Sequence, residues 1–126
     1  MRKLLLLLVA GCGPATGTLT MNLPIQATSA ADRIRLSVFE KQTCAALSFP
    51  LDGRVEPAAN DEFSRGALSD TTGQSATLSL ENVPAEVELT LTAEVFGRSG
   101  ELQFQGCEEG IMISTDEHHS VVLRLR

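Results

Sequence analysis

The stretch of strict alternation at residues 86–96 constrains the fold more than any other feature of the chain. Apolar side chains occupy every second position, and polar side chains fill the positions between them. The apolar set is Val87, Leu89, Leu91, Ala93 and Val95, and the polar set is Glu88, Thr90, Thr92 and Glu94. Because successive side chains of a strand point to opposite faces, this pattern predicts a β-strand with one buried face and one face in water.

Shorter stretches with the same period of two recur along the chain. They are residues 19–25, 34–38, 43–49, 76–81, 101–105, 111–113 and 121–125. The turn residues Gly97-Arg98-Ser99-Gly100 separate two of these stretches and predict a β-hairpin. Pro24 favours an edge position for the first strand, because proline cannot donate to a strand ladder. We therefore expect an all-β fold, a single antiparallel β-sandwich of about seven strands.

Residues 50–75 have no clear period and contain several prolines and glycines. A structureless loop of that length is uncommon inside a compact domain. We expect one or two short strands there, around Arg54-Val55 or Ala67-Leu68.

The start of the chain has the order of a secretion signal. Met1-Arg2-Lys3 is positively charged, and Leu4 to Val9 is an unbroken apolar run. That run is too short to span a bilayer, which takes about 20 residues. The following Val9-Ala10-Gly11-Cys12 resembles the bacterial lipobox, in which two small residues precede a cysteine that accepts lipid. The alternative is an ordinary secretory signal in which Cys12 happens to follow the cleavage site.

The lipobox resemblance implies an address and a division of the chain. Residues 1–11 would be a signal peptide, residues 12–18 the lipidated Cys12 with a flexible tether, and residues 19–126 the β-sandwich domain. Acyl chains such as palmitate, each methylene worth about 0.8 kcal/mol when buried, would hold the protein in the bilayer of the cell envelope. Many Gram-negative lipoproteins have Asp after the cysteine as a signal for retention, whereas this chain has Gly13. If the source is Gram-negative, the resemblance therefore implies the outer membrane, on its periplasmic or surface face.

The chain has three cysteines, an odd number that is unusual in a secreted protein. Lipidation would consume Cys12 and leave Cys44 and Cys107 as a pair in an oxidising compartment. We therefore expect a disulfide between Cys44 and Cys107, the alternative being two separate buried thiols.

Residues 76–126 resemble the immunoglobulin-like modules related to carboxypeptidase regulatory domains. The resemblance rests on the run Leu80-Glu81-Asn82-Val83-Pro84-Ala85, the alternating strand after it, and the later Gly100 and Leu102. Such modules commonly have an "nVPaG" turn between two strands and a "G-x-L" hairpin after them. Glu86 stands where the family usually has Gly, and no Tyr follows in the strand. The resemblance implies that the fold is a single immunoglobulin-like antiparallel β-sandwich of about seven strands, and that it is a non-catalytic structural or protein-binding module.

Charge and composition exclude several classes of partner. Removal of Arg2 and Lys3 with the signal peptide leaves 8 basic residues against 16 acidic ones, a net charge of −8. Such a surface repels nucleic acid and offers no basic patch to anionic lipid. The sequence also lacks Trp and Tyr, which sugar-binding surfaces commonly use. We expect no catalytic residues and no cofactor, since no G-x-S-x-G elbow or phosphate-binding glycine loop occurs.

Two functional hypotheses follow from these observations. The first is a membrane-anchored envelope lipoprotein whose non-catalytic sandwich is structural or binds an envelope protein, with exposed strand edges as the docking place. The second is an envelope lipoprotein that binds a small ligand or a metal ion, Ca²⁺ or Zn²⁺. Its candidate ligands are Asp116, His118 and His119, in an expected polar turn, together with the loop acids Asp52, Asp61, Glu62, Asp70, Glu108 and Glu109. Neighbouring histidines on a strand would point to opposite faces, which argues against a shared ion.

Overall fold

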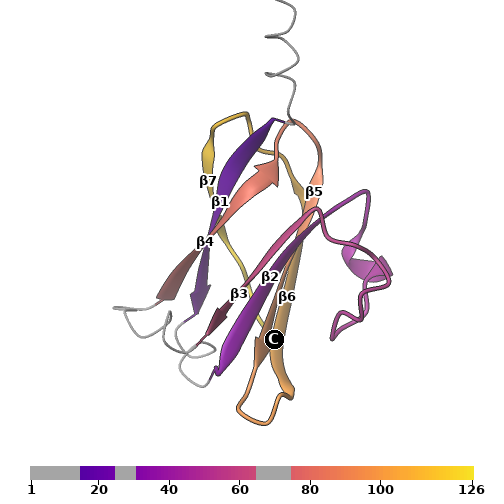
Figure 1. Ribbon diagram of the computed structural model, residues 1–126, viewed down its shortest axis with the longest axis vertical. Helices are drawn as coiled ribbons and strands as arrows, with labels where there is room; N and C mark the ends of the chain where they lie inside the picture. The colour runs from indigo at the N-terminus through magenta and orange to yellow at the C-terminus, as the bar shows by residue number, and fades with distance from the viewer. Residues whose placement is uncertain (1–14, 25–30, 65–74) are drawn as a thin grey trace, which may run out of the picture.

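The computed structural model describes residues 15–24, 31–64 and 75–126. Seven strands in these ranges form two sheets that pack as a sandwich (Figure 1). The strands are β1 (Thr16–Pro24), β2 (Arg33–Glu40), β3 (Ala59–Ser64), β4 (Ser75–Pro84), β5 (Leu89–Phe96), β6 (Leu102–Ile111) and β7 (His118–Val122). The expected all-β sandwich is therefore confirmed. In the described ranges, no helix has the length and apolar character needed to cross a membrane.

The two sheets differ in size and in strand direction. The three-stranded sheet has the order β4-β1-β7, in which β1 is antiparallel to β4 and parallel to β7. The four-stranded sheet has the order β3-β2-β5-β6 and is antiparallel throughout. Consecutive strands β1 and β2 therefore lie in opposite sheets, whereas the first two strands of a constant-type immunoglobulin domain share one sheet.

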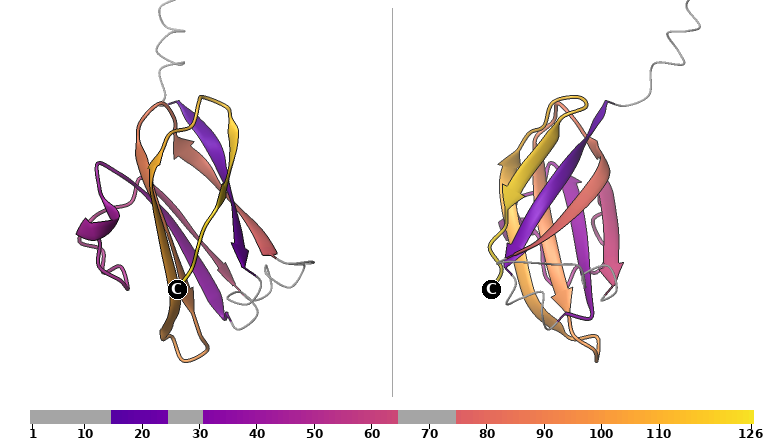
Figure 2. Two further views of the ribbon diagram at one scale, coloured as in Figure 1. Left: turned by 180° about the vertical axis from the view of Figure 1, so that it is seen from behind. Right: turned by 90° about the vertical axis from the view of Figure 1, so that its left-hand side faces the viewer.

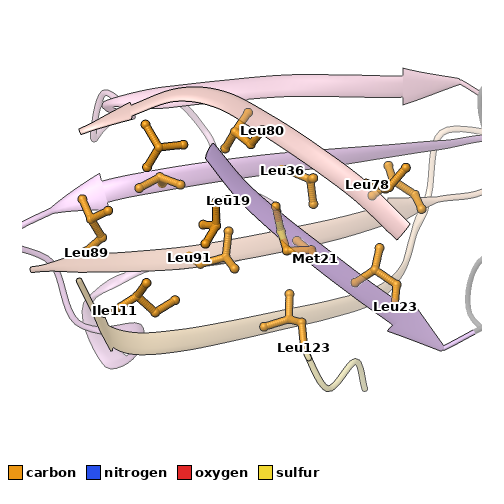
Figure 3. Close-up of a cluster of buried hydrophobic side chains, with 14 of the residues drawn as sticks. Leu19, Met21, Leu23, Leu36, Leu78, Leu80, Leu89, Leu91, Ile111 and Leu123 are labelled. Atoms are coloured by element: carbon orange, nitrogen blue, oxygen red, sulfur yellow. The ribbon is translucent and has the colours of Figure 1, made fainter. Parts of the chain in front are cut away.

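Inward-facing side chains from both sheets form one apolar core (Figure 3). Its members come from every second position of the strands, as the alternating patterns predict. The fully buried ones include Leu19, Met21, Leu23, Ile34, Leu36, Leu91, Val95 and Leu123. Each contributes about 1.5–3 kcal/mol by leaving water, so this shared core holds the two sheets together.

The polar face of β5 is buried rather than wet. Thr90, Thr92 and Glu94 are 2%, 0% and 0% exposed. Residues 41–58, between β2 and β3, lie on the outer side of the four-stranded sheet (magenta, right-hand side of Figure 1; seen from behind in Figure 2). The Thr90 hydroxyl donates to the carbonyl oxygen of Gln42 at 2.6 Å, so this segment covers the face. The prediction of a wet face is wrong, because alternation identifies polar positions and not what lies over them.

The expected strand at residues 43–49 is also wrong. A short 3-10 helix, η1 (Cys44–Ala46), lies there instead. The hydroxyl oxygen of Thr43 accepts a hydrogen bond from the N–H of Ala46 at 3.2 Å and caps this turn. Lys41 at φ 59° turns the chain out of the sheet just after β2, so residues 43–49 cannot continue its ladder.

Residues 50–75 contain one described strand, β3 (Ala59–Ser64), which pairs with β2. The expectation of a short strand in this stretch is correct, but the position at Arg54-Val55 is wrong. The other expected position, Ala67-Leu68, lies outside the described residues. β3 escapes a search for alternation because it is an edge strand, and most of its side chains are exposed.

The hairpin between β5 and β6 is confirmed. The Gly97 N–H donates to the carbonyl oxygen of Glu101 at 2.9 Å, and the Gly100 N–H donates to that of Gly97 at 3.0 Å. β6 then continues as far as Ile111, well past the expected end at residue 105.

The last strand was expected at residues 121–125, but it begins and ends three residues earlier. β7 covers His118–Val122, so the two histidines lie in a strand and not in a turn. Residues 123–126 leave the three-stranded sheet and reach β6, where Arg126 and Gln105 exchange backbone hydrogen bonds of 2.9 and 3.0 Å. Gly106 permits this crossing, because a Cβ there would lie 2.4 Å from the carbonyl oxygen of Arg124.

Two further expectations about the first strand need correction. Thr16, Gly17 and Thr18 belong to β1 and not to a flexible tether. β1 is the central strand of its sheet rather than an edge strand. Pro24 is tolerated because it is the last residue of β1 and lies beyond the stretch that pairs with β7.

Candidate functional site

The predicted disulfide between Cys44 and Cys107 is present. Its sulfur atoms are 2.07 Å apart and its Cα atoms 5.9 Å apart. Cys44 begins η1, and Cys107 lies on β6, so the bridge fastens the segment after β2 to the four-stranded sheet. The N–H of Cys44 also donates to Glu109 Oε2 at 2.7 Å. Cys12 lies outside the described residues.

The chain enters the sandwich at the end that we call the entry end, which holds the start of β1, residues 85–88 and residues 112–117 (top of Figure 1). The N–H of Ala85 donates to the carbonyl oxygen of Ala15 at 3.0 Å. The N–H of Asp116 donates to that of Thr16 at 2.9 Å. Both loops are therefore fixed to the first described residues of the chain.

The three residues proposed as zinc ligands do not converge. His118 is exposed, whereas His119 is half-buried with its Nδ1 3.3 Å from Glu117 Oε2. Asp116 occupies the left-handed region at φ 64° in the loop before them. Across the part of the chain that the structure describes, no three His, Cys, Asp or Glu side chains are grouped as metal ligands.

Three of the six acids considered for calcium pair with other residues of the protein. Asp52 pairs with Arg54 at 3.0 Å, and Glu62 pairs with Arg33 at 3.1 Å. Glu109 accepts the N–H of Cys44. The remaining three, Asp61, Glu108 and Asp70, do not complete a site, because Asp61 lies on β3, Glu108 on β6 and Asp70 outside the described residues.

An open cleft at the entry end gathers acidic side chains. Its volume is about 430 Å³, and its lining includes Glu40, Glu86, Glu88 and Glu109 together with Met112. These carboxylates make the end strongly acidic, but they are not grouped as metal ligands. The cleft therefore accounts for the acidic charge of this end of the molecule, and its carboxylates do not form a metal site.

Glu117 holds the loop before β7 in shape. Its Oε1 accepts the N–H of Ser114 at 2.6 Å, and its Oε2 faces His119. These hydrogen bonds, first that from the Ser114 backbone and then that from His119, lower the pKa of Glu117 below its ordinary value. The carboxylate form therefore stabilises the loop that leads into β7.

The outer edge of β7 is an open strand edge that the sequence did not single out. The N–H of Thr18 donates to the carbonyl oxygen of Glu117, and the N–H of Leu123 donates to that of Asn22. Since backbone groups alternate in direction along a strand, the N–H and C=O groups of the residues at 118, 120 and 122 point away from β1. Val122 is 74% exposed on this edge.

The other three sheet edges carry features that discourage pairing. β3 contains the run Asn60-Asp61-Glu62, and β4 has a register shift against β1. β6 has register shifts against β5, and its edge is occupied at Gln105 by Arg126. β7 pairs with β1 in unbroken register and contains no Asp, Glu, Lys, Arg or Pro. Charges, bulges and prolines are the usual protections of an edge, so β7 is the least protected.

Arg35 and Glu94 form a buried polar pair that sequence reasoning also missed. Arg35 Nε donates to Glu94 Oε1 at 2.8 Å, and the N–H of Leu51 donates to Glu94 Oε2 at 2.7 Å. The Glu94 side chain is 0% exposed and that of Arg35 27%. Arg35 and Glu94 occupy polar positions in the alternating patterns of β2 and β5. They pair because they lie opposite each other in the register of these two neighbouring strands. The pair fixes the covering segment, and both carboxylate oxygens of Glu94 are occupied.

Comparison of the sequence with known protein families and with curated proteins, and of the fold with solved structures, finds no match. Fold and site together define a small disulfide-bridged β-sandwich protein in which, among the described strands, β7 has the least protected edge.

Proposed function

We propose that this protein is a lipid-anchored lipoprotein of the cell envelope, whose non-catalytic sandwich docks a partner protein by strand addition at β7. The anchoring is supported by the cysteine pairing, the observation that carries this proposal. Cys44 and Cys107 are joined to each other. Cys12 is then the one remaining cysteine, and it stands at the end of the lipobox-like Val9-Ala10-Gly11-Cys12.

The short distance along the chain between Cys12 and β1 sets the orientation under this proposal. Three residues separate Cys12 from Thr16, the first residue of β1. Four residue steps span about 14 Å at most. A lipidated Cys12 would therefore keep the entry end close to the bilayer. β7 is parallel to β1 and would run away from the membrane, which leaves its edge open to a partner.

The outer edge of β7 suits an extended peptide. A strand added there would take up the free N–H and C=O groups at positions 118, 120 and 122. The side chains on this side are His118, Ser120 and Val122, which give a small, partly apolar surface on an acidic protein. Backbone pairing would supply most of the affinity, since few side chains are available for contact.

The turn before β5 supports kinship with the immunoglobulin-like modules of the carboxypeptidase regulatory type. Those modules usually have Gly where this chain has Glu86. Glu86 adopts φ 64°, a conformation that favours glycine. The side chain is retained at a cost in strain and accepts a hydrogen bond from the N–H of Thr115 at 3.1 Å. Glu86 therefore adopts a backbone conformation that glycine, the usual family residue, would take without strain.

The anchor is tested by the intact mass of the protein purified from membranes, before and after reduction. We expect a product that lacks residues 1–11, carries acyl chains and gains two hydrogens on reduction. The control is Cys12→Ser, which should yield a product without acyl chains. A soluble wild-type product without acyl chains would contradict the proposal.

The docking edge is tested by a photo-crosslinking amino acid placed at Val122 in cells. We expect a protein adduct that disappears when Ser120→Pro removes an outward N–H. The matched control Ser120→Ala keeps that N–H and should keep the adduct. Proline is tolerated where the lost N–H faces solvent, so both variants should remain folded. An adduct that survives Ser120→Pro would rule out strand addition at this edge.

A further inference from the structure

Residues 41–58 form a segment that we call the strap, and it is attached to the four-stranded sheet at a few defined points. The covalent attachment is the bridge from Cys44 to Cys107 on β6. The polar attachments include the bonds from Thr90 to the carbonyl oxygen of Gln42 and from the Leu51 N–H to Glu94. Arg35 adds a bond of 3.3 Å to the carbonyl oxygen of Leu51. At its end, the N–H of Ala58 donates to the carbonyl oxygen of Val38 at 2.7 Å, so the strap is fastened at its start, its middle and its end.

The surface beneath the strap carries polar side chains, whereas the core between the sheets is apolar. Thr90, Thr92 and Glu94 lie on the outward face of β5, and every buried polar side-chain atom in the described residues has a hydrogen-bond partner. Such groups keep their hydrogen bonding when water replaces the strap. Lifting the strap would therefore leave the main core between the sheets intact.

Few apolar side chains of the described residues are buried outside the core between the sheets. Phe39 and Leu47 are buried at 1% and 9% exposure, but neither belongs to the core cluster between the sheets. A hollow of about 90 Å³, lined by Leu47, Leu51 and Val55 among others, lies within the strap itself. The apolar side chains that line this open hollow have fewer contacts than side chains of a close-packed core. The covalent bridge is therefore a major part of what keeps the strap in place.

The bridge can be reached by a reductant. Both cysteines are half-buried and line an open groove of about 350 Å³ with Arg124 and Arg126. Glu108 lines the same groove and Glu109 Oε2 accepts the Cys44 N–H, so carboxylates stand near the bridge as well as guanidinium groups. The groove therefore gives a reductant access to the bridge without a one-sided charge.

We infer that the Cys44–Cys107 bridge is a redox-controlled fastening, and that its reduction by a dithiol releases the strap from a sandwich that stays folded. A thiolate of the dithiol attacks one sulfur of the bridge and forms a mixed disulfide while the other cysteine leaves as a thiolate. The second thiol of the dithiol then displaces the remaining cysteine. The dithiol becomes a disulfide, and Cys44 and Cys107 each take up a proton. This inference does not depend on the lipid anchor or on docking at β7.

Hydrogen exchange followed by mass spectrometry tests the inference on the full-length protein, with and without dithiothreitol. On reduction we expect amides of residues 42–58 to exchange at least about tenfold faster, while those of β2 and β5 keep their protection. Reoxidation should restore the slow rates. The double variant Cys44→Ser, Cys107→Ser should match the reduced protein without reductant, and Cys12→Ser alone should match the wild type.

Two outcomes would overturn the inference. Faster exchange in β2 and β5 to the same degree as in the strap would mean that the bridge stabilises the whole fold. Unchanged exchange in residues 42–58, with mass confirming full reduction, would mean that the strap is held without the bridge.

Discussion

The buried pair of Glu94 and Arg35 permits a sharp test of how the strap is held. The substitution Glu94→Gln keeps the shape of the side chain, but the amide has one oxygen where the carboxylate has two. Both oxygens of Glu94 are in use, one by Arg35 at 2.8 Å and the other by the Leu51 N–H at 2.7 Å. In the variant, an NH₂ group must face one of these donors.

The expected loss follows from these two contacts. A hydrogen bond to a charged group contributes about 1.5–3 kcal/mol, and a buried donor left without an acceptor costs about 1–3 kcal/mol. Arg35 is 27% exposed, so water recovers part of its lost solvation. We therefore expect Glu94→Gln to lower the free energy of unfolding by about 2–3 kcal/mol.

The matched control is Glu62→Gln on β3. Glu62 also pairs with an arginine across neighbouring strands, at 3.1 Å from Arg33, but both side chains are substantially exposed. Exposed pairs contribute about 0–1 kcal/mol, so the control should lose less than about 1 kcal/mol. Urea unfolding followed by circular dichroism gives both values, and unchanged m-values would confirm that stability alone has changed. Equal losses in the two variants would refute the reasoning that burial of Glu94 decides its contribution.

Substitutions at three further positions test other parts of the structure. Glu86→Gly should be more stable than Glu86→Ala by about 1 kcal/mol in urea unfolding, because position 86 has φ 64° and both variants lose the same carboxylate. The opposite order would exclude the left-handed turn. Gly106→Ala should cost about 1–3 kcal/mol by thermal unfolding, since its Cβ would meet the carbonyl oxygen of Arg124; a neutral effect would show that the tail does not cross β6. The pKa of Glu117 is lowered, so its carboxylate stabilises the fold above the unfolded pKa, and this stability is lost as pH falls through the lower folded pKa. Stability profiles over pH should therefore show a smaller loss in acid for Glu117→Gln than for the wild type, and identical slopes would contradict the assignment.

The amino-acid sequence determined the strand-forming stretches and their inward faces. The alternation at residues 86–96 correctly placed Leu91 and Val95 in the core, because the period of side-chain direction is a local property of a strand. The turn residues at 97–100 likewise determined the hairpin, since a hairpin joins neighbours along the chain. The odd number of cysteines indicated that Cys44 and Cys107 pair.

The tertiary structure alone decided which segments lie beside one another and which faces are covered. Thr90, Thr92 and Glu94 have the sequence pattern of a wet face, but a segment of the same chain lies over them. β3 was missed because an edge strand needs no buried alternation, and β7 was misplaced because the tail leaves its sheet at Leu123 to join β6. These outcomes depend on contacts between residues far apart in sequence, whereas periodicity reports only on neighbouring residues. The open edge of β7 and the strap over β5, on which the proposals rest, are both products of such distant contacts.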